Sequence, residues 1–523
     1  MADTTTDSDQ LTGALPESER DRRHQETEAA AWYAALGVIA FGTALRLIVG
    51  ARLPLLPDET YYWDWSRHLA FGYFDHPPMI AWLIALGTNL LGVNPLGVRI
   101  MMIAAGTVAS VAMALIARRV ANAHTAAETA IVISAMPLAA AGLVLATNDA
   151  PLLAFTALTL FFIIRAMQSE RRSMDSLKSW AWAGVMLGLA FSSKYTAILL
   201  PIGVLIAFVS HRQLWPRFAE WGPYVACIVA ALVFLPVLMW NARHDWISFV
   251  YQIEHGLGDA ITLRGAWRHE GDLLGGQAGL ATPILFVMIA IAVAKSLRPR
   301  LGPEKWMLAV VTTTFFAFFV YSALKKRVEA NWPAPAYIGG VVLFACYKWS
   351  ETSKRWRAAG IALAGVLSLA VYLHAVQPIV PVPPPKDPVA RAFGWREVAH
   401  GVARAAAAPL PAGGKVFMAA DRYQEASQIA YWLSGNPETF ALNLGGRRNQ
   451  YDLWPSFTNR AHIGDRLVVA LDETDGVHET IIALTPHFAS ILRGELIEMQ
   501  RGNGTIGLRR IYTLDGWRGT WPR

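Results

Sequence analysis

Residues 222–240 read GPYVACIVAALVFLPVLMW, and residues 98–117 read VRIMMIAAGTVASVAMALIA. A helix needs about 20 mostly apolar residues to cross the hydrocarbon core of a bilayer, and both runs reach that length. Similar runs recur between residues 31 and 376, whereas the rest of the chain has a mixed composition. The sequence therefore predicts a polytopic α-helical membrane protein with a C-terminal part outside the bilayer.

The composition agrees with this prediction. Of the 523 residues, 54% are hydrophobic and only 16% are charged, while soluble domains carry about 25% charged residues. The net charge of +7 is typical of cytoplasmic loops rich in Lys and Arg, so we expect no nucleic-acid partner. Cys227 and Cys346 lie inside apolar runs and indicate neither a disulfide framework nor a cysteine metal site.

The hydropathy pattern predicts about 11 transmembrane helices, some of them short or interrupted. The candidate spans are residues 31–51, 98–117, 127–146, 150–166, 180–192, 196–210, 222–240, 277–294, 306–323, 333–347 and 358–376. Basic clusters then fall in alternate loops, at residues 20–23, 118–119, 165–178, 212–217, 295–305 and 348–357. Because excess Lys and Arg marks cytoplasmic loops, we expect a cytoplasmic N-terminus and an outer C-terminal part.

One apolar stretch does not fit this scheme. Residues 79–93 are too short to span, and a crossing there would move the basic pair Arg118 and Arg119 to the outer side. We predict instead a helix at the outer interface that follows Pro77 and Pro78.

Three domains are expected. Residues 1–30 are polar and predict a disordered cytoplasmic tail, and residues 31–376 form the membrane domain. Residues 377–523 open with an extended proline-rich connector, 378–388. The segments that follow alternate between strand and helix patterns and predict a small α/β domain: strands at 415–419, 439–443 and 466–471, and a helix at 422–433.

The first outer loop contains two adjacent carboxylates that are candidate functional residues. Asp58 and Glu59 follow the first span, where a carboxylate at the water boundary could orient or deprotonate an acceptor group. The alternative is structural, because an Asp after Pro57 is a good N-cap for a following helix. The aromatic residues of the same loop fit an interfacial belt as well as a sugar platform.

Residues 58–83, DETYYWDWSRHLAFGYFDHPPMIAWL, resemble the first outer loop of bacterial relatives of protein O-mannosyltransferases. This group includes lipid A aminoarabinose transferases and related uronosyltransferases, all with the GT-C membrane fold. The likeness continues over most of the membrane region and into the tail, at Thr147–Leu152, Ser193–Thr196, Asn331–Pro335, Asp421–Gln424 and Asn449–Asp452. The first-loop motif is long and fairly specific, and the other motifs are suggestive.

The resemblance implies an inverting transferase that uses a polyprenyl-phosphate sugar donor. It makes Asp58 and Glu59 the catalytic carboxylate motif and Asp149 a second functional acid, although Asp149 could also be an N-cap. Aminoarabinose transferases carry a lysine before the Pro-Pro pair, where this chain has His76. Asp75 and His76 are candidates for binding the donor phosphate or another substrate group. A histidine is only fractionally charged near neutral pH, so the departure weakens a role in binding phosphate.

Further candidates for binding the donor phosphate or another substrate group come from basic residues on the outer side. Lys194 stands between two apolar stretches, where it could bind a ligand or extend to the interface. The triplet Lys325, Lys326 and Arg327, with Glu329 close by, opposes the positive-inside trend. It could hold an anionic headgroup or contact anionic lipid as a solvated loop.

Two other segments bear on cofactors and substrates. The outer loop 241–277 mixes His and carboxylate residues in no recognised metal spacing. We expect no tightly bound metal there, and a divalent cation stays an open alternative. Tyr423 follows a predicted strand, but no Gly-rich phosphate loop precedes its helix, so we expect no nucleotide cofactor. The tail is expected to cover the membrane site and recognise the acceptor.

The predicted activity is transfer of one sugar from a polyprenyl-phosphate carrier to a periplasmic acceptor, either lipid A or another envelope lipid or glycan. Asp58 is the expected general base or acceptor-orienting acid, supported by Glu59. The expected location is a bacterial inner membrane, among its lipids. A lipid-linked sugar flippase without covalent chemistry is the competing hypothesis, and it would place charges near the bilayer midplane. A non-catalytic assembly subunit is a third.

Overall fold

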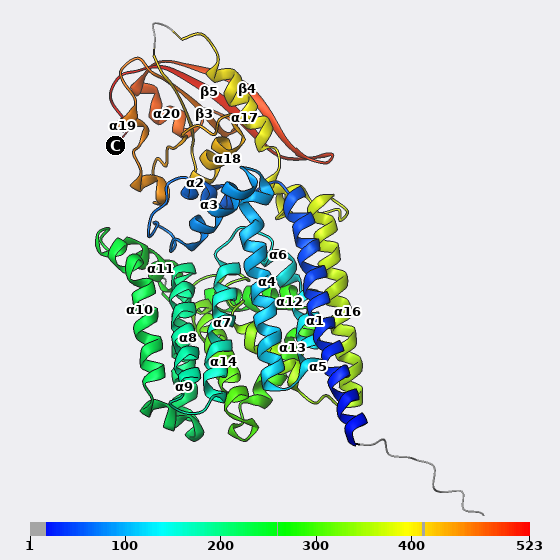
Figure 1. The fold of residues 1–523 in the computed structure, drawn as a ribbon. Helices are drawn as coiled ribbons and strands as arrows, with labels where there is room; N and C mark the ends of the chain where they lie inside the picture. Colours follow the sequence, from blue (N-terminus) through cyan, green and yellow to red (C-terminus); the bar gives the residue numbers. More distant parts are fainter. Residues whose placement is uncertain (1–16, 259, 411–413, 523) are drawn as a thin grey trace, which may run out of the picture.

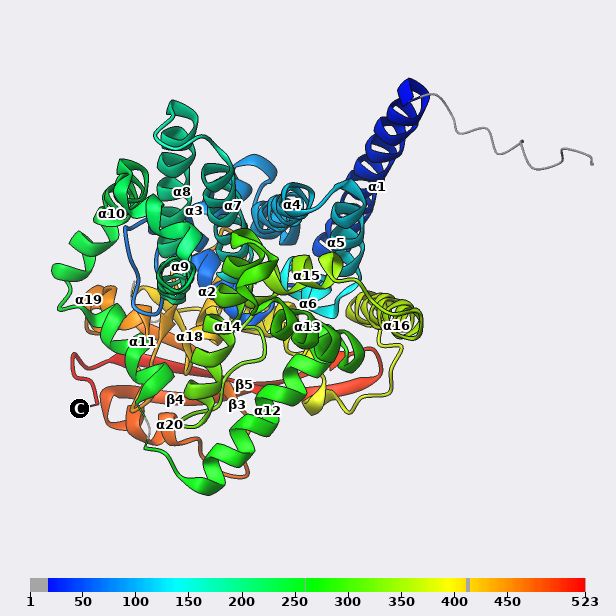
Figure 2. The ribbon, with the colours of Figure 1, turned by 90° about the horizontal axis from the view of Figure 1, so that it is seen from below.

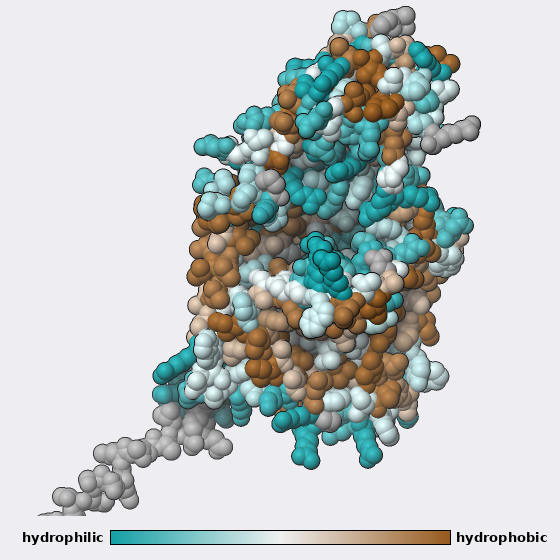
Figure 3. All heavy atoms as spheres, turned by 180° about the vertical axis from the view of Figure 1, so that it is seen from behind, coloured by the Kyte–Doolittle hydropathy of each residue, from teal (hydrophilic) through white to brown (hydrophobic). Residues whose placement is uncertain are grey.

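The computed structural model describes residues 17–258, 260–410 and 414–522. A helical body carries a sheet domain at one end, and α1 and α16 run side by side along one edge of the body (Figure 1). Hydrophobic side chains cover much of the surface of the helical body (Figure 3). This is the surface expected of helices that face lipid.

Among the described residues, six helices are long and apolar enough to cross a membrane, or up to eight if each of two bent helix pairs counts as one span. The six are α1 (Glu17–Arg52), α4 (Pro95–Val120), α7 (Asp149–Gln168), α10 (Trp221–Ala242), α14 (Pro303–Ala323) and α16 (Glu351–Val376). In the first bent pair, the 3₁₀ helix η1 (Tyr195–Ile198) and α9 (Leu199–Ser210) are followed by the 3₁₀ helix η2 (Arg212–Ala219). In the second, α12 (Leu263–Ala281) is followed by α13 (Pro283–Ser296).

Every predicted span overlaps a helix, but the number of 11 spans is not confirmed. The remaining predicted spans correspond to shorter or less apolar helices: α5 (Ala123–Ala135) with α6 (Pro137–Gly142), α8 (Met174–Ser193) and α15 (Ala336–Cys346). Helix α15 is 11 residues long, and nearly all of them are buried. Its apolar run fills the protein core, which hydropathy alone does not distinguish from a lipid-facing span.

One prediction about an irregular segment is wrong. Helix α1 extends back to Glu17, so residues 17–30 are not disordered, whereas residues 1–16 lie outside the described residues. Charge pairs one turn apart, Arg23 with Glu19 and Arg22 with Glu26, support this polar part of the helix. The outer loop 241–277 contains α11 (Ile247–Leu257) and most of α12.

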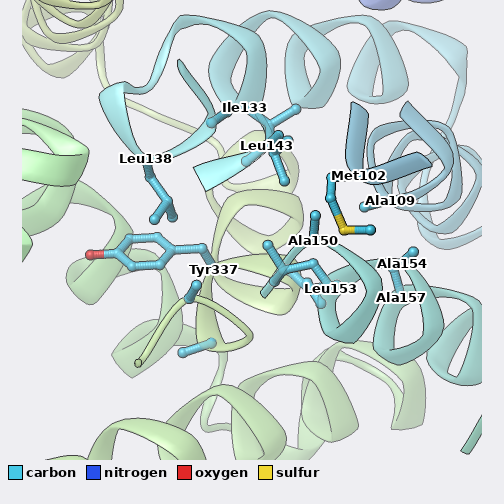
Figure 4. Close-up of a cluster of buried hydrophobic side chains, with 14 of the residues drawn as sticks. Met102, Ala109, Ile133, Leu138, Leu143, Ala150, Leu153, Ala154, Ala157 and Tyr337 are labelled. Atoms are coloured by element: carbon cyan, nitrogen blue, oxygen red, sulfur yellow. The ribbon is translucent and has the colours of Figure 1, made fainter. Parts of the chain in front are cut away.

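Close packing of small residues fixes the start of α7. Met102 and Ala109 of α4 face Ala150, Leu153, Ala154 and Ala157 of α7 in a buried cluster (Figure 4). Small side chains let helix backbones approach closely in a membrane protein. The first turn of α7, which begins with Asp149, is therefore held rigidly against its neighbours.

The C-terminal domain is built on a five-stranded sheet of order β2-β1-β3-β5-β4. Strands β1 (Val416–Ala420), β2 (Phe440–Ala441) and β3 (Arg466–Asp472) are parallel, and β4 (Phe488–Arg501) and β5 (Gly504–Trp517) form an antiparallel hairpin. Its helices are α17 (Trp395–Ala406), α18 (Tyr423–Trp432), α19 (Phe457–Arg460) and α20 (Glu479–Leu484). Short 3₁₀ helices lie at Tyr195–Ile198, Arg212–Ala219, Pro299–Leu301, Pro384–Lys386, Ala390–Ala392, Gln450–Leu453 and Thr485–His487.

The sheet domain sits on two short helices of the first outer loop. Helix α2 (Pro57–Ser66) lies directly beneath α18, and α3 (Met79–Leu91) lies beside α2 at the same end of the helical body (Figure 1). The ring of Trp63 in α2 meets that of Tyr431 in α18 edge to face, with 5.2 Å between ring centroids. This junction positions the candidate site.

Candidate active site

A cavity of about 1080 Å³ lies where the membrane helices meet the C-terminal domain. Its polar wall combines segments that are far apart in sequence: the start of α2, the loop before α3, the start of α7, the end of α8, α11 and the start of α18. Of the predicted site residues, the cavity is lined by Asp58, Asp75, His76, Asp149, Lys194, Glu329 and Tyr423.

Asp58 is the second residue of α2 and faces the cavity. It is not the N-cap, because that position belongs to Leu56, whose backbone N–H is capped by the carboxylate of Glu59. The Asp58 carboxylate instead accepts a hydrogen bond from Gln424 Nε2, with 2.7 Å between Nε2 and Oδ1. The structural alternative considered for Asp58 from the sequence therefore does not apply.

Glu59 has a different environment from its neighbour. Its side chain is fully buried and paired with Arg99, with 2.7 Å from Nε to Oε1 and 2.5 Å from Nη2 to Oε2. It also accepts hydrogen bonds from the backbone N–H groups of Leu56 and Ala146. Glu59 does not line the cavity. Its contacts hold the start of α2 in place, and its part in catalysis stays a prediction.

Asp149 and Lys194 form an ion pair in the cavity wall, with 2.7 Å between Oδ1 and Nζ. Asn331 donates to the other oxygen of Asp149 at 2.5 Å, and the ammonium of Lys194 lies 6.0 Å from the ring centroid of Trp332. Three motifs that are separated along the chain thus converge on one carboxylate. Asp149 is the first residue of α7 rather than its N-cap.

Asp75, in the loop before α3, joins the membrane domain to the sheet domain. It accepts hydrogen bonds from Tyr61 at 2.6 Å and from Arg447 at 2.9 Å. Burial raises the pKa of Asp75 to about 6, although the positive charge of Arg447 and the hydrogen bond from Tyr61 oppose the change. Arg447 also donates to the hydroxyls of Tyr251 and Tyr423.

His76 adds no positive charge to the site. Burial lowers its pKa to about 3, and the nearby positive charges of Lys194, His255 and Arg447 act in the same direction. Its Nδ1 lies 3.3 Å from Nε2 of Gln252. At neutral pH the imidazole can form hydrogen bonds with a ligand, but it cannot neutralise a phosphate as a lysine would.

The basic triplet lies outside the cavity lining. Lys325 donates to the backbone carbonyl of Leu257, and Arg327 faces Glu329 at 3.9 Å on the surface. The positive charge of Lys326 helps to lower the pKa of His255, which does line the cavity. The triplet therefore stands near the site without forming its wall.

Two site residues of the C-terminal domain were not predicted. Gln424 belongs to the quoted stretch 421–424, and Arg447 precedes the quoted stretch 449–452. The sequence signal for both residues was their proximity to these motifs. Only the packing of the C-terminal domain on the first outer loop brings Gln424 to Asp58 and Arg447 to Asp75. Within the described residues, no group of three or more His, Cys, Asp and Glu side chains is arranged to hold a metal ion.

Comparison with known proteins agrees with the resemblance read from the first loop. A family model described as dolichyl-phosphate-mannose-protein mannosyltransferase matches residues 75–240. The lipid A galacturonosyltransferase RgtD of Rhizobium johnstonii is 28% identical over 72% of this chain and 77% of its own length. An undecaprenyl phosphate-α-4-amino-4-deoxy-L-arabinose arabinosyl transferase of Pseudomonas aeruginosa is 30% identical over 42% of this chain and 43% of its own length.

Solved structures carry the same fold. ArnT from Cupriavidus metallidurans bound to undecaprenyl phosphate superposes with a TM-score of 0.66 at 15% identity, over 91% of this chain and 97% of that one. The archaeal oligosaccharyltransferase AglB from Archaeoglobus fulgidus gives 0.52 at 12% identity, over 84% and 69%. The chain is a multi-pass inner-membrane protein of the GT-C fold. The predicted resemblance to glycosyltransferases of this fold is confirmed.

Proposed function

We propose that this protein is an inverting glycosyltransferase that moves one sugar from a polyprenyl-phosphate donor to a periplasmic acceptor, either lipid A or another envelope lipid or glycan. The relatives named above support the reaction class, since one is a lipid A galacturonosyltransferase and another an aminoarabinose transferase using undecaprenyl phosphate. None of the relatives named above is described as a transporter.

The observation that carries the proposal is that one cavity joins a charged chamber to an apolar groove. Beyond Lys194, the lining continues between α8, α9, α10 and α14 with apolar side chains: Leu187, Phe191, Ile198, Leu199, Pro201, Cys227, Ala230, Ala231, Phe234, Leu238, Phe318 and Phe319. Because the groove is apolar, it suits a polyprenyl chain. A carrier bound there has its phosphate beside Lys194.

The chemistry follows from that placement. The acceptor oxygen attacks the anomeric carbon from the face opposite the carrier, a new carbon–oxygen bond forms, and the bond to the phosphate oxygen breaks. Lys194 stabilises the negative charge that develops on the departing phosphate. Asp58 takes the acceptor proton or, if the acceptor is an ionised phosphate, orients it without a proton transfer. A single displacement of this kind inverts the anomeric centre.

The charge distribution disfavours a flippase. A transporter places its binding groups and broken helices near the bilayer midplane. Here Asp58 lies on the short helix α2, Asp75 on the loop before α3 and Arg447 on the sheet domain, all at the end of the helical body. The same arrangement supports a periplasmic position for residues 377–523 and a cytoplasmic N-terminus, because the basic clusters of the opposite loops then lie inside.

A transfer assay tests the proposal. Purified protein in lipid vesicles receives radiolabelled polyprenyl-phosphate pentoses, hexoses and uronic acids, of full and shortened chain length, together with an envelope lipid extract. We expect label to reach an acceptor, faster from the full-length carrier. We also expect Asp58→Asn to slow transfer by about 100-fold or more. Asp475→Asn, a change at an exposed loop residue, serves as the matched control and should transfer normally.

The outcomes separate the hypotheses. Equal transfer by wild type and Asp58→Asn would support the transferase activity but contradict the catalytic role proposed for Asp58. Movement of donor across the bilayer without label on any acceptor would favour the flippase instead.

A further inference from the structure

The acid proposed to act on the acceptor is held by a side chain from the other domain. Gln424 and Asp58 are 366 positions apart, and each is the second residue of its helix, α18 and α2 respectively. The positive ends of two helices thus lie beside one carboxylate, where they favour negative charge. Within the described residues, Gln424 is the hydrogen-bond partner of the Asp58 side chain.

The position of Gln424 is fixed by the contacts that follow it along α18. One turn further, the hydroxyls of Ser427 and Thr60 are 2.9 Å apart in a buried contact. Gln428 then donates to the backbone carbonyl of Leu55 at 2.8 Å, just before α2 begins. These contacts and the Trp63–Tyr431 ring contact together set the register of α18 on α2, so the loss of one of them leaves the Gln424 amide beside the Asp58 carboxylate.

We propose that Gln424 is a positioning residue for the transfer reaction: its amide N–H holds Oδ1 of Asp58 so that Oδ2 faces the acceptor. This inference rests on the proposed function. An amide NH₂ donates without adding charge, so it orients an ionised carboxylate and leaves its second oxygen able to accept a proton or a hydrogen bond. A carboxylate on the exposed side of a helix would otherwise exchange between rotamers. The sheet domain is then part of the active site as well as its cover.

A simpler role for Gln424 is to dock the sheet domain, and the same interface offers a control for it. Ser427 lies three residues further on the same helix and also makes one side-chain contact with α2, but it does not touch Asp58. Ser427→Ala therefore removes the contact with Thr60 and the hydrogen bond that the Ser427 hydroxyl donates to the backbone carbonyl of Gln424. It leaves the Gln424 amide and the Asp58 carboxylate unchanged. Gln424→Ala removes one hydrogen bond of similar length and frees the carboxylate.

The test measures kcat and KM for donor and acceptor in the vesicle assay with wild type, Gln424→Ala, Gln424→Glu and Ser427→Ala. We expect Gln424→Ala to lower kcat roughly 10- to 100-fold with little change in donor KM, as expected for a misplaced reacting group. Ser427→Ala should stay within about twofold of wild type, since it alters no group near the reacting atoms. Thermal midpoints should be similar for the two alanine variants.

The pH profile separates positioning from docking. In Gln424→Glu two carboxylates face each other and share one proton at low pH, so the glutamic acid can still donate to Asp58. We expect this variant to keep a substantial part of its activity under acidic conditions and to lose it as the shared proton leaves at higher pH, unlike wild type.

Each outcome decides the inference. A kcat for Gln424→Ala within twofold of wild type would overturn it, as would an equal loss in Ser427→Ala. A pH profile of Gln424→Glu parallel to that of wild type would also overturn it. Failure of wild type to transfer any sugar would overturn the proposed function itself, which distinguishes the two failures.

Discussion

Four carboxylates near the cavity differ in the partner that each one meets. Asp58 is held by the neutral amide of Gln424, Asp149 by Lys194, Asp75 by Arg447, and Glu59 by Arg99. A neutral partner leaves a carboxylate oxygen available, whereas a buried bidentate guanidinium engages both oxygens. Asp58 and Glu59 are adjacent in sequence, yet of the two only Asp58 lines the cavity.

Asp75 should make stability depend on pH. Its pKa is raised by burial from 3.8 to about 6, so the folded protein binds this proton more tightly than the unfolded chain does. The contribution to stability is therefore present below about pH 4 and lost as the pH rises through about 6. We expect the thermal midpoint of wild type to fall relative to that of Asp75→Asn over this range, by the equivalent of about 1–3 kcal/mol.

Thermal unfolding in one detergent between pH 4.5 and 7.5 checks this expectation. Asp475→Asn is the control, because an exposed loop carboxyl should leave the slope unchanged. If the thermal midpoints of wild type and Asp75→Asn changed with pH in parallel, the proposed effect of Asp75 on stability would be contradicted.

At the scale of elements, one buried ion pair ties together several segments. Arg99 of α4 binds Glu59 of α2 and also donates to the backbone carbonyls of Gly50, Leu53 and Pro54, at and just beyond the end of α1. Glu59 in turn accepts from the backbone N–H of Ala146, in the connection that leads to α7. The start of α2, which carries Asp58, is therefore positioned by the membrane helices beneath it.

Arg99→Met should destabilise the protein by about 3–5 kcal/mol, since it leaves a buried carboxylate without its partner. The thermal midpoint in detergent measures this loss. Arg119→Met, a change at an exposed position near the end of the same helix, should have a much smaller effect. If the two variants had equal midpoints, the ion pair would not be what holds α2.

The sequence predicted some elements of the C-terminal domain more accurately than others. Alternating strand and helix patterns located β1, α18 and β3 to within about one residue. The β4–β5 hairpin was not predicted, although its two-residue turn, Gly502-Asn503, is a common turn signal. Strand β4 is largely solvent-exposed, and β5 passes from half-buried to buried positions without alternating. Both strands therefore lack the clean apolar alternation that marks a half-buried strand.

At the scale of the whole molecule, the orientation in the membrane stays a prediction with a direct test. In a chain with Cys227→Ala and Cys346→Ala, we introduce Asp475→Cys in the sheet domain or Arg355→Cys near the start of α16. We expect a membrane-impermeant maleimide, applied from the periplasmic side, to label the first variant. The second should react only after the inner membrane is opened. The reverse pattern would invert the proposed topology.

The sequence by itself determined that this is a membrane protein with a separate α/β domain, because apolar runs and strand–helix alternation are local properties of the chain. It also supplied Asp58, Asp149 and Lys194, through motifs that resemble a known family. The tertiary structure alone decided the partners: Gln424 for Asp58, Arg447 for Asp75, and Arg99 for Glu59. These contacts join residues tens to hundreds of positions apart, and their geometry depends on how helices and domains pack, which no local pattern encodes.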